Sequence, residues 1–348
     1  MVRACWYLGV AALLAMTSAR VSAQTARDSL TARRAALERT LQAYEADTTR
    51  DLKGVAVQQH GVRLVERYYN GQRDTTLHDI RSAAKSITSM LVGLMLQRRP
   101  VHTLDTPLGT LLPGALVAEQ QRIRLRDLLT MRAGFDSDDE DSTARGNEVL
   151  LDESADWMAF LRGVPMKHPP GERYVYSSLT AFVAGRVVEQ RMGQPLSDFA
   201  RNALFEPIGI RRFVWRRGPK GEGVGQGNLF ISLRDMTALG ELVLRNGRAN
   251  GQPLVDSAYL AQSLSAQVPI GDVDPYADSY GYMWYTRQHV VNGEPVRVHF
   301  ASGNGGNKIY VIPQRDAVVT IASRAYGRRH GQRRSERILL DVLPLLRR

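Results

Sequence analysis

Residues 82–97, SAAKSITSMLVGLMLQ, form an apolar run that opens with a hydroxyl and an amine. The length and composition of this run predict a buried helix. Ser82 and Lys85 are three residues apart, so they lie on one face of that helix. Ser82 stands at the predicted helix N-terminus, where free backbone N–H groups and the positive end of the helix dipole favour a developing anion.

A serine and a lysine at this spacing suit nucleophilic catalysis. A serine hydroxyl is a poor nucleophile until a base takes its proton. Lys85 can be that base when its amine is neutral, and burial favours the neutral form of an amine. Five lysines and twenty serines in 348 residues give about 0.3 chance matches to S-x-x-K, so the spacing alone is a weak signal. Its position at the start of an apolar helix, directly after a predicted strand pair, strengthens it.

Two further segments can complete such a site. Tyr176 lies in PGERYVYSS (170–178), ahead of a second apolar helical run, where a phenol can shuttle protons between serine, lysine and leaving group. In ASGNGG (301–306), small residues let a substrate approach a strand edge, and backbone N–H groups near Gly303 and Asn304 can complete an oxyanion hole. The plainer alternatives are a tyrosine that anchors its loop in the core and an ordinary hairpin loop.

The rest of the chain predicts one sheet built from both ends. Alternating apolar residues indicate two strands within 54–71, around a Gln-His-Gly turn. Three more strands are predicted at 295–300, 308–313 and 317–323. Helices are expected at 27–46, 82–97, 124–134 (closed by Gly134), 233–246 and 335–348. Residues 105–215 consist mostly of helices and loops, so the simplest assembly is a helix-flanked sheet with a helical insertion.

Several other kinds of site are excluded or set aside. The sequence contains no G-x-S-x-G nucleophile elbow and no HExxH zinc helix, and we expect no metal and no cofactor. The acidic string DSDDED (136–141) lacks the glycine and terminal glutamate of a calcium loop, so it is interpreted as a solvated loop. The glycine-rich residues 218–228 lack the G-K-[ST] ending of a phosphate loop and are interpreted as a flexible connection. His168 and His299 are isolated, which favours structural histidines over ligands.

The composition is that of a globular protein with excess positive charge. Apolar residues make up 43% and charged residues 23% of the chain, which excludes a disordered chain and a disulfide-stapled mini-protein. The 46 Lys and Arg residues against 35 Asp and Glu give a formal net charge of +11. All but five of these cations are arginine, which favours a coding bias over nucleic-acid binding, so no nucleic-acid partner is expected.

The first 23 residues predict a secretory signal peptide. Arg3 gives a positive start, residues 5–16 are apolar, and Val-Ser-Ala at 21–23 fits a cleavage site before Gln24. The only cysteine, Cys5, lies within the signal, so the mature chain has no thiol for a disulfide, a nucleophile or a metal. No segment is long enough to span a bilayer. We therefore expect a secreted or periplasmic protein without a membrane span.

The three motifs, in this order, resemble the penicillin-binding-protein and class C β-lactamase superfamily of serine hydrolases, and most closely its 6-aminohexanoate-dimer hydrolase and carboxylesterase branch. The resemblance covers nearly the whole mature chain and rests on IRSAAKSITSMLVG, RLRDLLTMRAGF, PGERYVYSS, LFEPIGI and FASGNGGNKIYVIP. It implies an α+β, β-lactamase/transpeptidase-like fold: an antiparallel sheet flanked by helices, plus an all-helical region, with the active site between them. It also implies one domain over 24–348, with its sheet part at about 24–104 and 216–348 and its helical region at about 105–215.

The resemblance also assigns roles within the site. Ser82 corresponds to the nucleophile, Lys85 to the base and Tyr176 to the proton shuttle. Ser178 stands where the family usually has asparagine, so its hydrogen bond to substrate has a shorter reach. Ala301 stands where the family usually has the lysine or histidine that grips a substrate carboxylate.

The loss of that cation favours ester or simple amide substrates over β-lactams and D-Ala-D-Ala peptides. Arg297, His299 and Lys308 remain candidates to replace it. Residues 148–152, EVLLD, show only a faint similarity to the class A β-lactamase deacylation motif, and we interpret this similarity as a chance match.

Two functions fit these observations. The first is an exported serine hydrolase that acts through an acyl-enzyme on a small ester or amide. The second is a catalytically silent cell-envelope protein that holds peptidoglycan or an anionic polymer. The formal charge of +9 that remains after loss of Arg3 and Arg20, together with the arginine-rich residues 328–337, supports the second. The complete set of serine, lysine and tyrosine positions favours the hydrolase.

Overall fold

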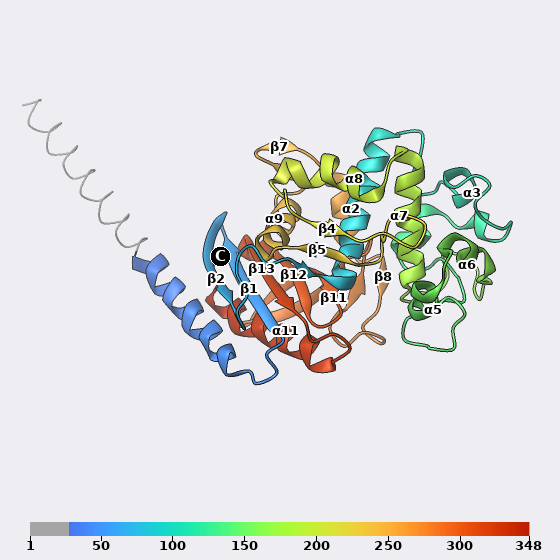
Figure 1. The fold of residues 1–348 in the computed structure, drawn as a ribbon. Coiled ribbons are helices and arrows are strands. Elements are labelled where there is room, and N and C mark those ends of the chain that lie inside the picture. The colour runs from blue at the N-terminus through green and yellow to red at the C-terminus, as the bar shows by residue number, and fades with distance from the viewer. Residues whose placement is uncertain (1–27, 348) are drawn as a thin grey trace, which may run out of the picture.

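The computed structural model describes residues 28–347, and its centre is an eight-stranded antiparallel sheet (Figure 1). The strand order β2-β1-β13-β12-β11-β10-β9-β8 places strands from the two ends of the chain side by side. The strands are β1 (Leu52–Gln59), β2 (Val62–Tyr68), β8 (Val268–Pro269), β9 (Ser279–Tyr280), β10 (Tyr285–Val291), β11 (Glu294–Gly303), β12 (Asn307–Ile312) and β13 (Ala317–Ser323). The predicted strands within 54–71 and at 295–300, 308–313 and 317–323 are confirmed.

Two tight turns set the register of the hairpins β1–β2 and β10–β11. His60 and Gly61 have φ angles of 53° and 72°, and Asn292 and Gly293 have φ angles of 52° and 81°. Two successive residues with positive φ are typical of the type I′ turn, whose twist matches that of paired strands. The sequence patterns above miss β10, although Asn-Gly between two extended runs is itself a hairpin signal.

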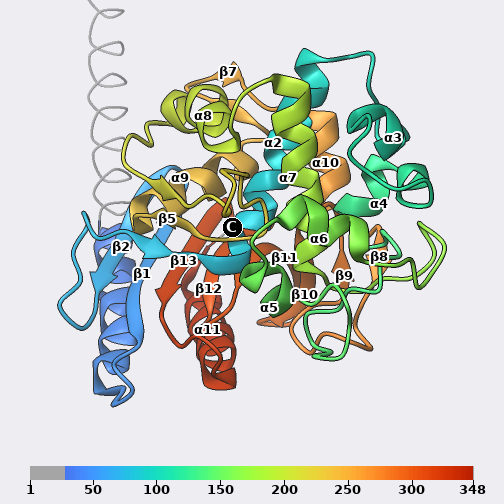
Figure 2. The ribbon, with the colours of Figure 1, turned by 45° about the vertical axis from the view of Figure 1, so that its right-hand side comes forward.

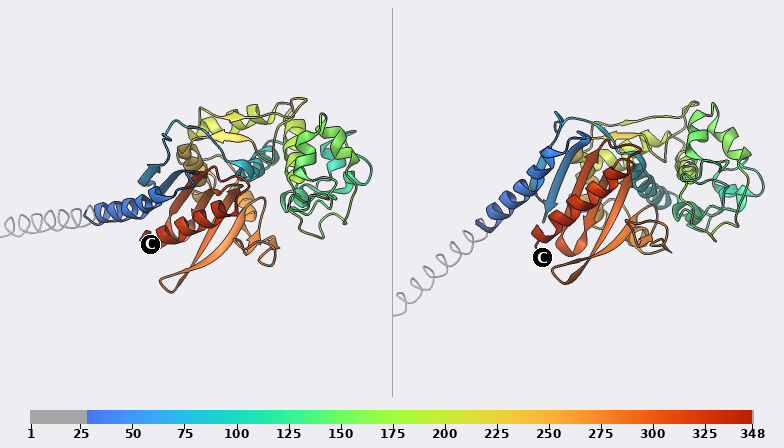
Figure 3. Two further views of the ribbon diagram at one scale, coloured as in Figure 1. Left: turned by 60° about the horizontal axis from the view of Figure 1, so that its bottom comes forward. Right: turned by 90° about the horizontal axis from the view of Figure 1, so that it is seen from below.

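Helices cover both faces of this sheet. α9 (Leu233–Leu244) and α2 (Ala84–Arg98) lie on one face, whereas α11 (Arg329–Val342) and a helix over residues 28–42 lie on the other (Figure 3). Gly240 lets α9 approach the strands closely, because a Cβ there would lie 2.5 Å from a Val318 methyl group. The predicted helices at 27–46 and 233–246 are thus confirmed, whereas the C-terminal helix begins at Arg329, six residues before the predicted start at 335.

The helices between the two parts of the sheet gather around α2. α7 (Ser178–Met192) packs along α2 (Figure 2). The remaining helices are α3 (Leu108–Leu111), α4 (Leu125–Leu129), α5 (Glu148–Glu153), α6 (Trp157–Gly163), α8 (Leu196–Ala200) and, later in the chain, α10 (Ser257–Leu264). α2 and α7 are buried along most of their length, so they form the wall on which the candidate site is built.

Short elements complete the fold. Single-turn helices are η1 (Ala43–Ala46), η2 (Arg81–Ala83), η3 (Gln120–Arg122), η4 (Arg201–Phe205), η5 (Glu206–Ile208), η6 (Pro313–Arg315) and η7 (Leu343–Leu345). A small sheet of order β3-β5-β4 combines β3 (His78–Asp79), β5 (Leu229–Ile231) and β4 (Val214–Trp215), and a two-stranded sheet pairs β6 (Arg248–Ala249) with β7 (Gln252–Pro253). β3 leads into the Ser82 turn, and β5 follows the glycine-rich residues 218–228. Both strands therefore help to position the candidate site.

Two sequence predictions for the segments around these helices are wrong. The helix expected over 124–134 ends at Leu129, because Met131 turns the chain with a φ of 55°. Gly134 is therefore no helix cap; it is required by packing, since a Cβ there would lie 2.2 Å from the His168 carbonyl oxygen. The glycine-rich residues 218–228 are not a free connection either. Gly225 packs against α7, and its carbonyl oxygen accepts a hydrogen bond of 2.7 Å from the Thr88 hydroxyl.

Across residues 28–347, no helix is both long enough and apolar enough to cross a membrane. The predicted signal peptide over 1–23, with Cys5, lies outside the described residues.

Candidate active site

Ser82 lies in a short 3-10 turn that runs directly into α2. η2 covers Arg81–Ala83 and α2 begins at Ala84, so the predicted start of the α-helix at Ser82 is wrong by two residues. Arg81 adopts a left-handed φ of 52°, and its N–H donates a hydrogen bond of 2.9 Å to Asp79 Oδ1. A non-glycine residue in this conformation is strained and persists only where its surroundings fix it. The strained residue directly precedes the candidate nucleophile.

Lys85 is buried beside Ser82, with only 2% of its surface exposed. Its Nζ lies 2.9 Å from Ser82 Oγ, 3.0 Å from Ser178 Oγ and 3.0 Å from the Gln226 carbonyl oxygen. A neutral amine in this place donates its two hydrogens to Ser178 and Gln226 and receives the Ser82 proton on its lone pair. An ammonium donates to all three oxygens. The arrangement therefore accommodates both states of a lysine that exchanges a proton with Ser82.

Ser178 connects Lys85 to two carboxylates. Its Oγ lies 2.7 Å from Asp139 Oδ2 and 2.9 Å from Glu148 Oε2, and its backbone N–H donates to Asp139. The interpretation of residues 136–141 as a solvated loop is therefore wrong for Asp139, which accepts the Ser178 N–H at the start of α7. Residues 148–152, whose motif similarity we interpret as a chance match, lie in α5, which brings Glu148 to the same hydroxyl.

The two carboxylates compete for one hydroxyl proton. The Ser178 hydroxyl carries one proton, and Lys85 donates a hydrogen bond to its oxygen. The hydroxyl can therefore donate to only one of the two carboxylates. A proton held by the carboxyl pair satisfies the second contact. Consistent with this, burial and the charge of Glu148 raise the pKa of Asp139 to about 6, although the charge of Lys85 opposes the shift. Burial and Glu148 also raise the pKa of Asp152, one turn further along α5.

Tyr176 lies on another side of the same amine. The centre of its ring is 5.1 Å from Lys85 Nζ, a cation–π distance. Its carbonyl oxygen accepts a hydrogen bond of 3.1 Å from the Asp139 N–H, which fixes this loop to the carboxylate segment. The structure thus brings Ser82, Lys85, Tyr176 and Ser178 together around one nitrogen atom.

The loop at 301–306 lies against the Ser82 turn at one point. A Cβ on Gly303 would lie 2.0 Å from the Ile80 carbonyl oxygen and 3.2 Å from the Ala83 nitrogen, so only glycine permits this approach. Asn304 uses its side chain within the fold, because its Oδ1 accepts the Gly327 N–H at 2.8 Å. Gly303 therefore adjoins the candidate nucleophile, whereas the Asn304 amide oxygen is occupied elsewhere.

The three candidates for the missing third-motif cation differ in position. Arg297 is exposed on β11, four residues before Ala301. His299 is buried and bonded to Thr286 at 2.8 Å, and burial lowers its pKa to about 4, so it is neutral at pH 7. This confirms His299 as a structural histidine. Lys308 pairs with Ser302, so its side chain leaves the sheet on the face opposite to that of Ala301.

Gln226 is a polar residue at the site that the sequence patterns give no reason to select. It is 7% exposed, and within the described part of the chain neither polar atom of its amide has a hydrogen-bond partner. A buried amide without partners costs free energy, and such a group calls for a structural or functional reason. Its backbone carbonyl binds Lys85, so this amide belongs to the same site. Between residues 28 and 347, no three His, Cys, Asp or Glu side chains form a group suited to a metal ion.

Solved structures of similar fold include two hydrolases. "Putative 6-aminohexanoate-dimer hydrolase from Bacillus anthracis" aligns with a TM-score of 0.69 and 17% identity, over 84% of this chain and 79% of that chain. "EstCE1, a hydrolase with promiscuous acyltransferase activity" aligns with a TM-score of 0.70 and 18% identity, over 92% of this chain and 99% of that chain. At these identities the likeness shows the fold, which is the predicted one.

Curated relatives match over shorter segments. A protein of Escherichia coli (strain K12) named "Putative D-alanyl-D-alanine carboxypeptidase" is 23% identical over 154 residues, which are 42% of this chain and 35% of that protein. The chain thus spans about a third of the length of this curated relative. The beta-lactamase family model, in contrast, matches residues 36–343. That match runs through the sheet, the Ser82 turn and the helical region alike, which confirms the resemblance inferred from the motifs: the chain belongs to the beta-lactamase family.

Proposed function

We propose that this protein is an exported serine hydrolase that cleaves a small ester or amide through an acyl-enzyme. The observation that carries the proposal is the contact of 2.9 Å between Lys85 Nζ and Ser82 Oγ, formed by a lysine that is 2% exposed. A base within hydrogen-bond reach of a serine hydroxyl is what activates that hydroxyl as a nucleophile.

In the proposed reaction, Ser82 Oγ forms a bond to the substrate carbonyl carbon while its proton passes to Lys85 Nζ. The backbone N–H groups of Ser82 and of the Gly303 segment stabilise the oxyanion. As the tetrahedral intermediate collapses, the scissile C–O or C–N bond breaks, and the proton held by Lys85 passes through Tyr176 to the leaving group. Water then attacks the acyl-enzyme and gives a proton to Lys85. The bond from Ser82 Oγ to the acyl carbon breaks, Lys85 returns the proton to Ser82 Oγ, and the acid leaves.

Ser178 is a positioning residue in this scheme. It holds Lys85 Nζ at 3.0 Å, and Asp139 and Glu148 hold Ser178 in turn. A serine at this position has too short a side chain to hold the lysine and also reach a substrate in the way that an asparagine would. The carboxylates behind it supply the polar contacts that keep its hydroxyl aimed at the amine.

Ester or simple amide substrates fit better than β-lactams. The Ala301 side chain is apolar and buried, so this position of β11 offers no cation to a substrate carboxylate. The similar structures whose names state a reaction are hydrolases, which supports an active enzyme over the alternative of a silent envelope-binding protein. We place the enzyme outside the cytoplasm on the strength of residues 1–23, and recovered mature protein should begin at Gln24.

Two measurements test the proposal. Wild type should hydrolyse 4-nitrophenyl butyrate, and Ser82→Ala should lose roughly 10³-fold or more in kcat/KM. Ser86→Ala, one turn along the same helix, is the matched control and should keep its activity, because Ser86 bonds the Met283 carbonyl rather than Lys85. A fluorophosphonate should label the peptide that carries Ser82. A label on another serine, or equal activity of Ser82→Ala and wild type, would overturn the assignment.

A further inference from the structure

A second feature lies next to Arg81, the residue that precedes Ser82. A cavity of about 360 Å³ opens there, lined by Arg81, Arg216 and Arg324 together with Asp79, Phe230 and Tyr326. The three guanidinium groups come from three separate segments: the Ser82 turn, the strand β4 segment and the residues that follow β13. The fold therefore converges three fixed positive charges on one small space.

These charges are not balanced by the protein. Asp79 is the only carboxylate among the lining residues, and its Oδ2 lies 3.3 Å from Arg81 Nε. Across residues 28–347, neither Arg216 nor Arg324 forms an ion pair. Arg216 lies over the Phe230 ring at 5.1 Å, which leaves its N–H groups free to bind other acceptors. The cavity thus carries an excess of two positive charges.

The cavity and the catalytic centre share Arg81. This residue is joined directly to Ser82, and its guanidinium lies 4.4 Å from the centre of the Tyr326 ring. A ligand in the cavity therefore adjoins the turn that carries Ser82.

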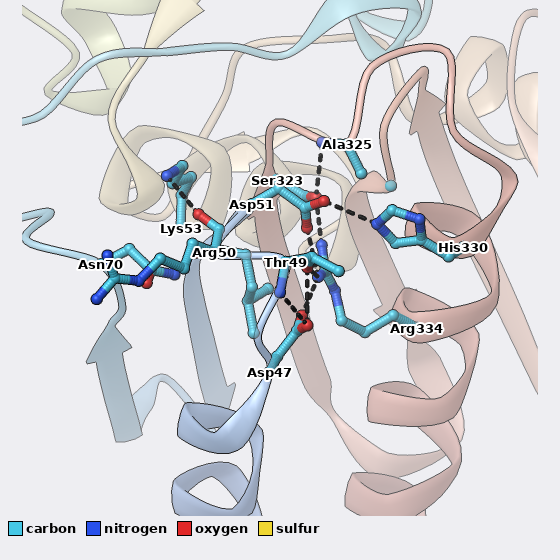
Figure 4. Close-up of polar contacts among 12 residues, drawn as sticks. Asp47, Thr49, Arg50, Asp51, Lys53, Asn70, Ser323, Ala325, His330 and Arg334 are labelled. Atoms are coloured by element: carbon cyan, nitrogen blue, oxygen red, sulfur yellow. Dashed lines mark hydrogen bonds and ion pairs between the residues drawn. The ribbon is translucent and has the colours of Figure 1, made fainter.

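The segment that carries Arg324 and Tyr326 is held in place by a separate ion cluster. Arg334, whose side chain is 9% exposed, binds both Asp47 and Asp51 and donates a hydrogen bond of 2.8 Å to Ser323 Oγ (Figure 4). The Arg324 N–H donates to the Asp51 carbonyl oxygen at 2.8 Å. The backbone under the cavity is thus ordered before any ligand binds, which lowers the entropic cost of binding.

We propose that this cavity is a substrate subsite that binds an anionic group, a carboxylate or a phosphate. Guanidinium groups match the geometry of both anions and bind them through paired N–H groups. The substrate is then an ester or amide that carries this group some atoms away from the carbonyl that Ser82 attacks. The inference rests on the proposed function and names a feature of its substrate class.

Matched substrates test the subsite. 4-Nitrophenyl butyrate and 4-nitrophenyl hemisuccinate have acyl chains of equal length, of which only the second ends in a carboxylate. Phenyl acetates with and without a carboxylate on the phenyl ring test the leaving-group side. After correction for the rates in buffer alone, one anionic substrate should exceed its neutral partner in kcat/KM by roughly tenfold or more. Higher salt should reduce this advantage.

Variants then locate the effect. Arg216→Gln and Arg324→Gln should each lower the ratio of anionic to neutral kcat/KM several-fold. Arg217→Gln is the control: it removes an equal charge next to Arg216, but Arg217 lies 3.7 Å from Asp198 and does not line the cavity. It should leave the ratio unchanged. Inhibition of butyrate hydrolysis by inorganic phosphate, compared with inhibition by acetate, identifies which anion binds better.

The outcomes separate this inference from the proposed function. If neutral esters are hydrolysed by wild type but not by Ser82→Ala, the hydrolase stands. If neither anionic substrate is then preferred, or if Arg217→Gln changes the ratio as much as the other two variants, the subsite is wrong. If no ester is hydrolysed at all, the proposed function is wrong. Thermal unfolding then decides on the anion site: phosphate should protect wild type more than it protects Arg216→Gln. Equal protection would mean that the subsite is wrong as well.

Discussion

The two sides of Ser82 carry opposite excesses of charge. On one side a single ammonium-forming group, Lys85, faces the carboxyl groups of Asp139, Glu148 and, further off, Asp152. On the other side three guanidinium groups face one carboxylate. Asp139 and Glu148 are half-buried and accept hydrogen bonds from Ser178, whereas the two unpaired guanidinium groups are exposed. The difference indicates that the carboxylate side positions the protein's own catalytic lysine, and that the arginine side is open to a ligand.

The largest effect is expected from Lys85→Arg. Arginine keeps the positive charge but cannot release its proton at any working pH, so it cannot serve as a base. We expect kcat for a neutral nitrophenyl ester to fall by roughly 10²- to 10⁴-fold, the range typical of lost general base catalysis. In Lys85→Ala, propylamine added to the buffer should restore part of the activity. Near-normal turnover by Lys85→Arg would mean that another group, such as Tyr176, removes the Ser82 proton.

A smaller effect is expected from Asp139→Asn, measured on stability. In the folded protein the pKa of Asp139 is about 6, against an ordinary value of 3.8, because of burial and Glu148. The folded chain therefore keeps a proton that the unfolded chain releases as the pH rises from about 4 to 6, and wild type loses stability across this window. Asparagine cannot ionise, so the variant does not lose this stability. Relative to wild type, its free energy of unfolding should rise by up to about 3 kcal/mol between pH 4 and pH 6 and stay higher above pH 6.

The control for this experiment is the same substitution in a Glu148→Gln background. The gain should be smaller there, because burial still acts on Asp139 while the repulsion from Glu148 is gone. Urea unfolding at pH 4 and at pH 7 measures both differences. A variant that is equally destabilised at both pH values would contradict the crowded-carboxylate description of this side of Ser82.

Sequence patterns identified the groups with intrinsic chemistry but not those whose role depends on tertiary contacts. Ser82, Lys85 and Tyr176 belong to motifs with fixed spacing, and the structure gathers them around one nitrogen atom. Asp139 lies in an acidic loop and Glu148 in a short helix. Apart from the faint motif similarity of residues 148–152, nothing local distinguishes them from solvated residues. Only the packing of these segments against the start of α7 makes them part of the site.

The same limit applies to the arginine cavity. With 41 arginines in the chain, no local pattern singles out Arg81, Arg216 and Arg324, which are far apart in the sequence. The pairing of β3 with β5 and of β4 with β5 brings the first two together, and the end of β13 supplies the third. Strand periodicity predicted most of the large sheet, because its alternating apolar residues are a local signal. The two-residue strands that frame the cavity are too short to give one.

The smallest effect is expected from Lys308→Met, which tests whether every cation near the site is open to substrate. Lys308 is 2% exposed, lies 4.6 Å from the centre of the Phe300 ring, and leaves the sheet on the face opposite to Ala301. Burial lowers its pKa to about 8, so its charge already carries a free-energy cost at pH 7. If it is a core residue, methionine should change the ratio of kcat/KM for 4-nitrophenyl butyrate to that for a cephalosporin by less than about twofold, because methionine has a similar length and fills the same apolar space.

The folded-state pKa of Lys308 lies below the ordinary value of 10.5, so wild type should gain stability relative to the variant as the pH rises from about 8 to 10.5. A tenfold loss of cephalosporin turnover alone would show instead that Lys308 acts through Ser302 as the missing cation, and that burial does not separate the structural cations from those that bind substrate.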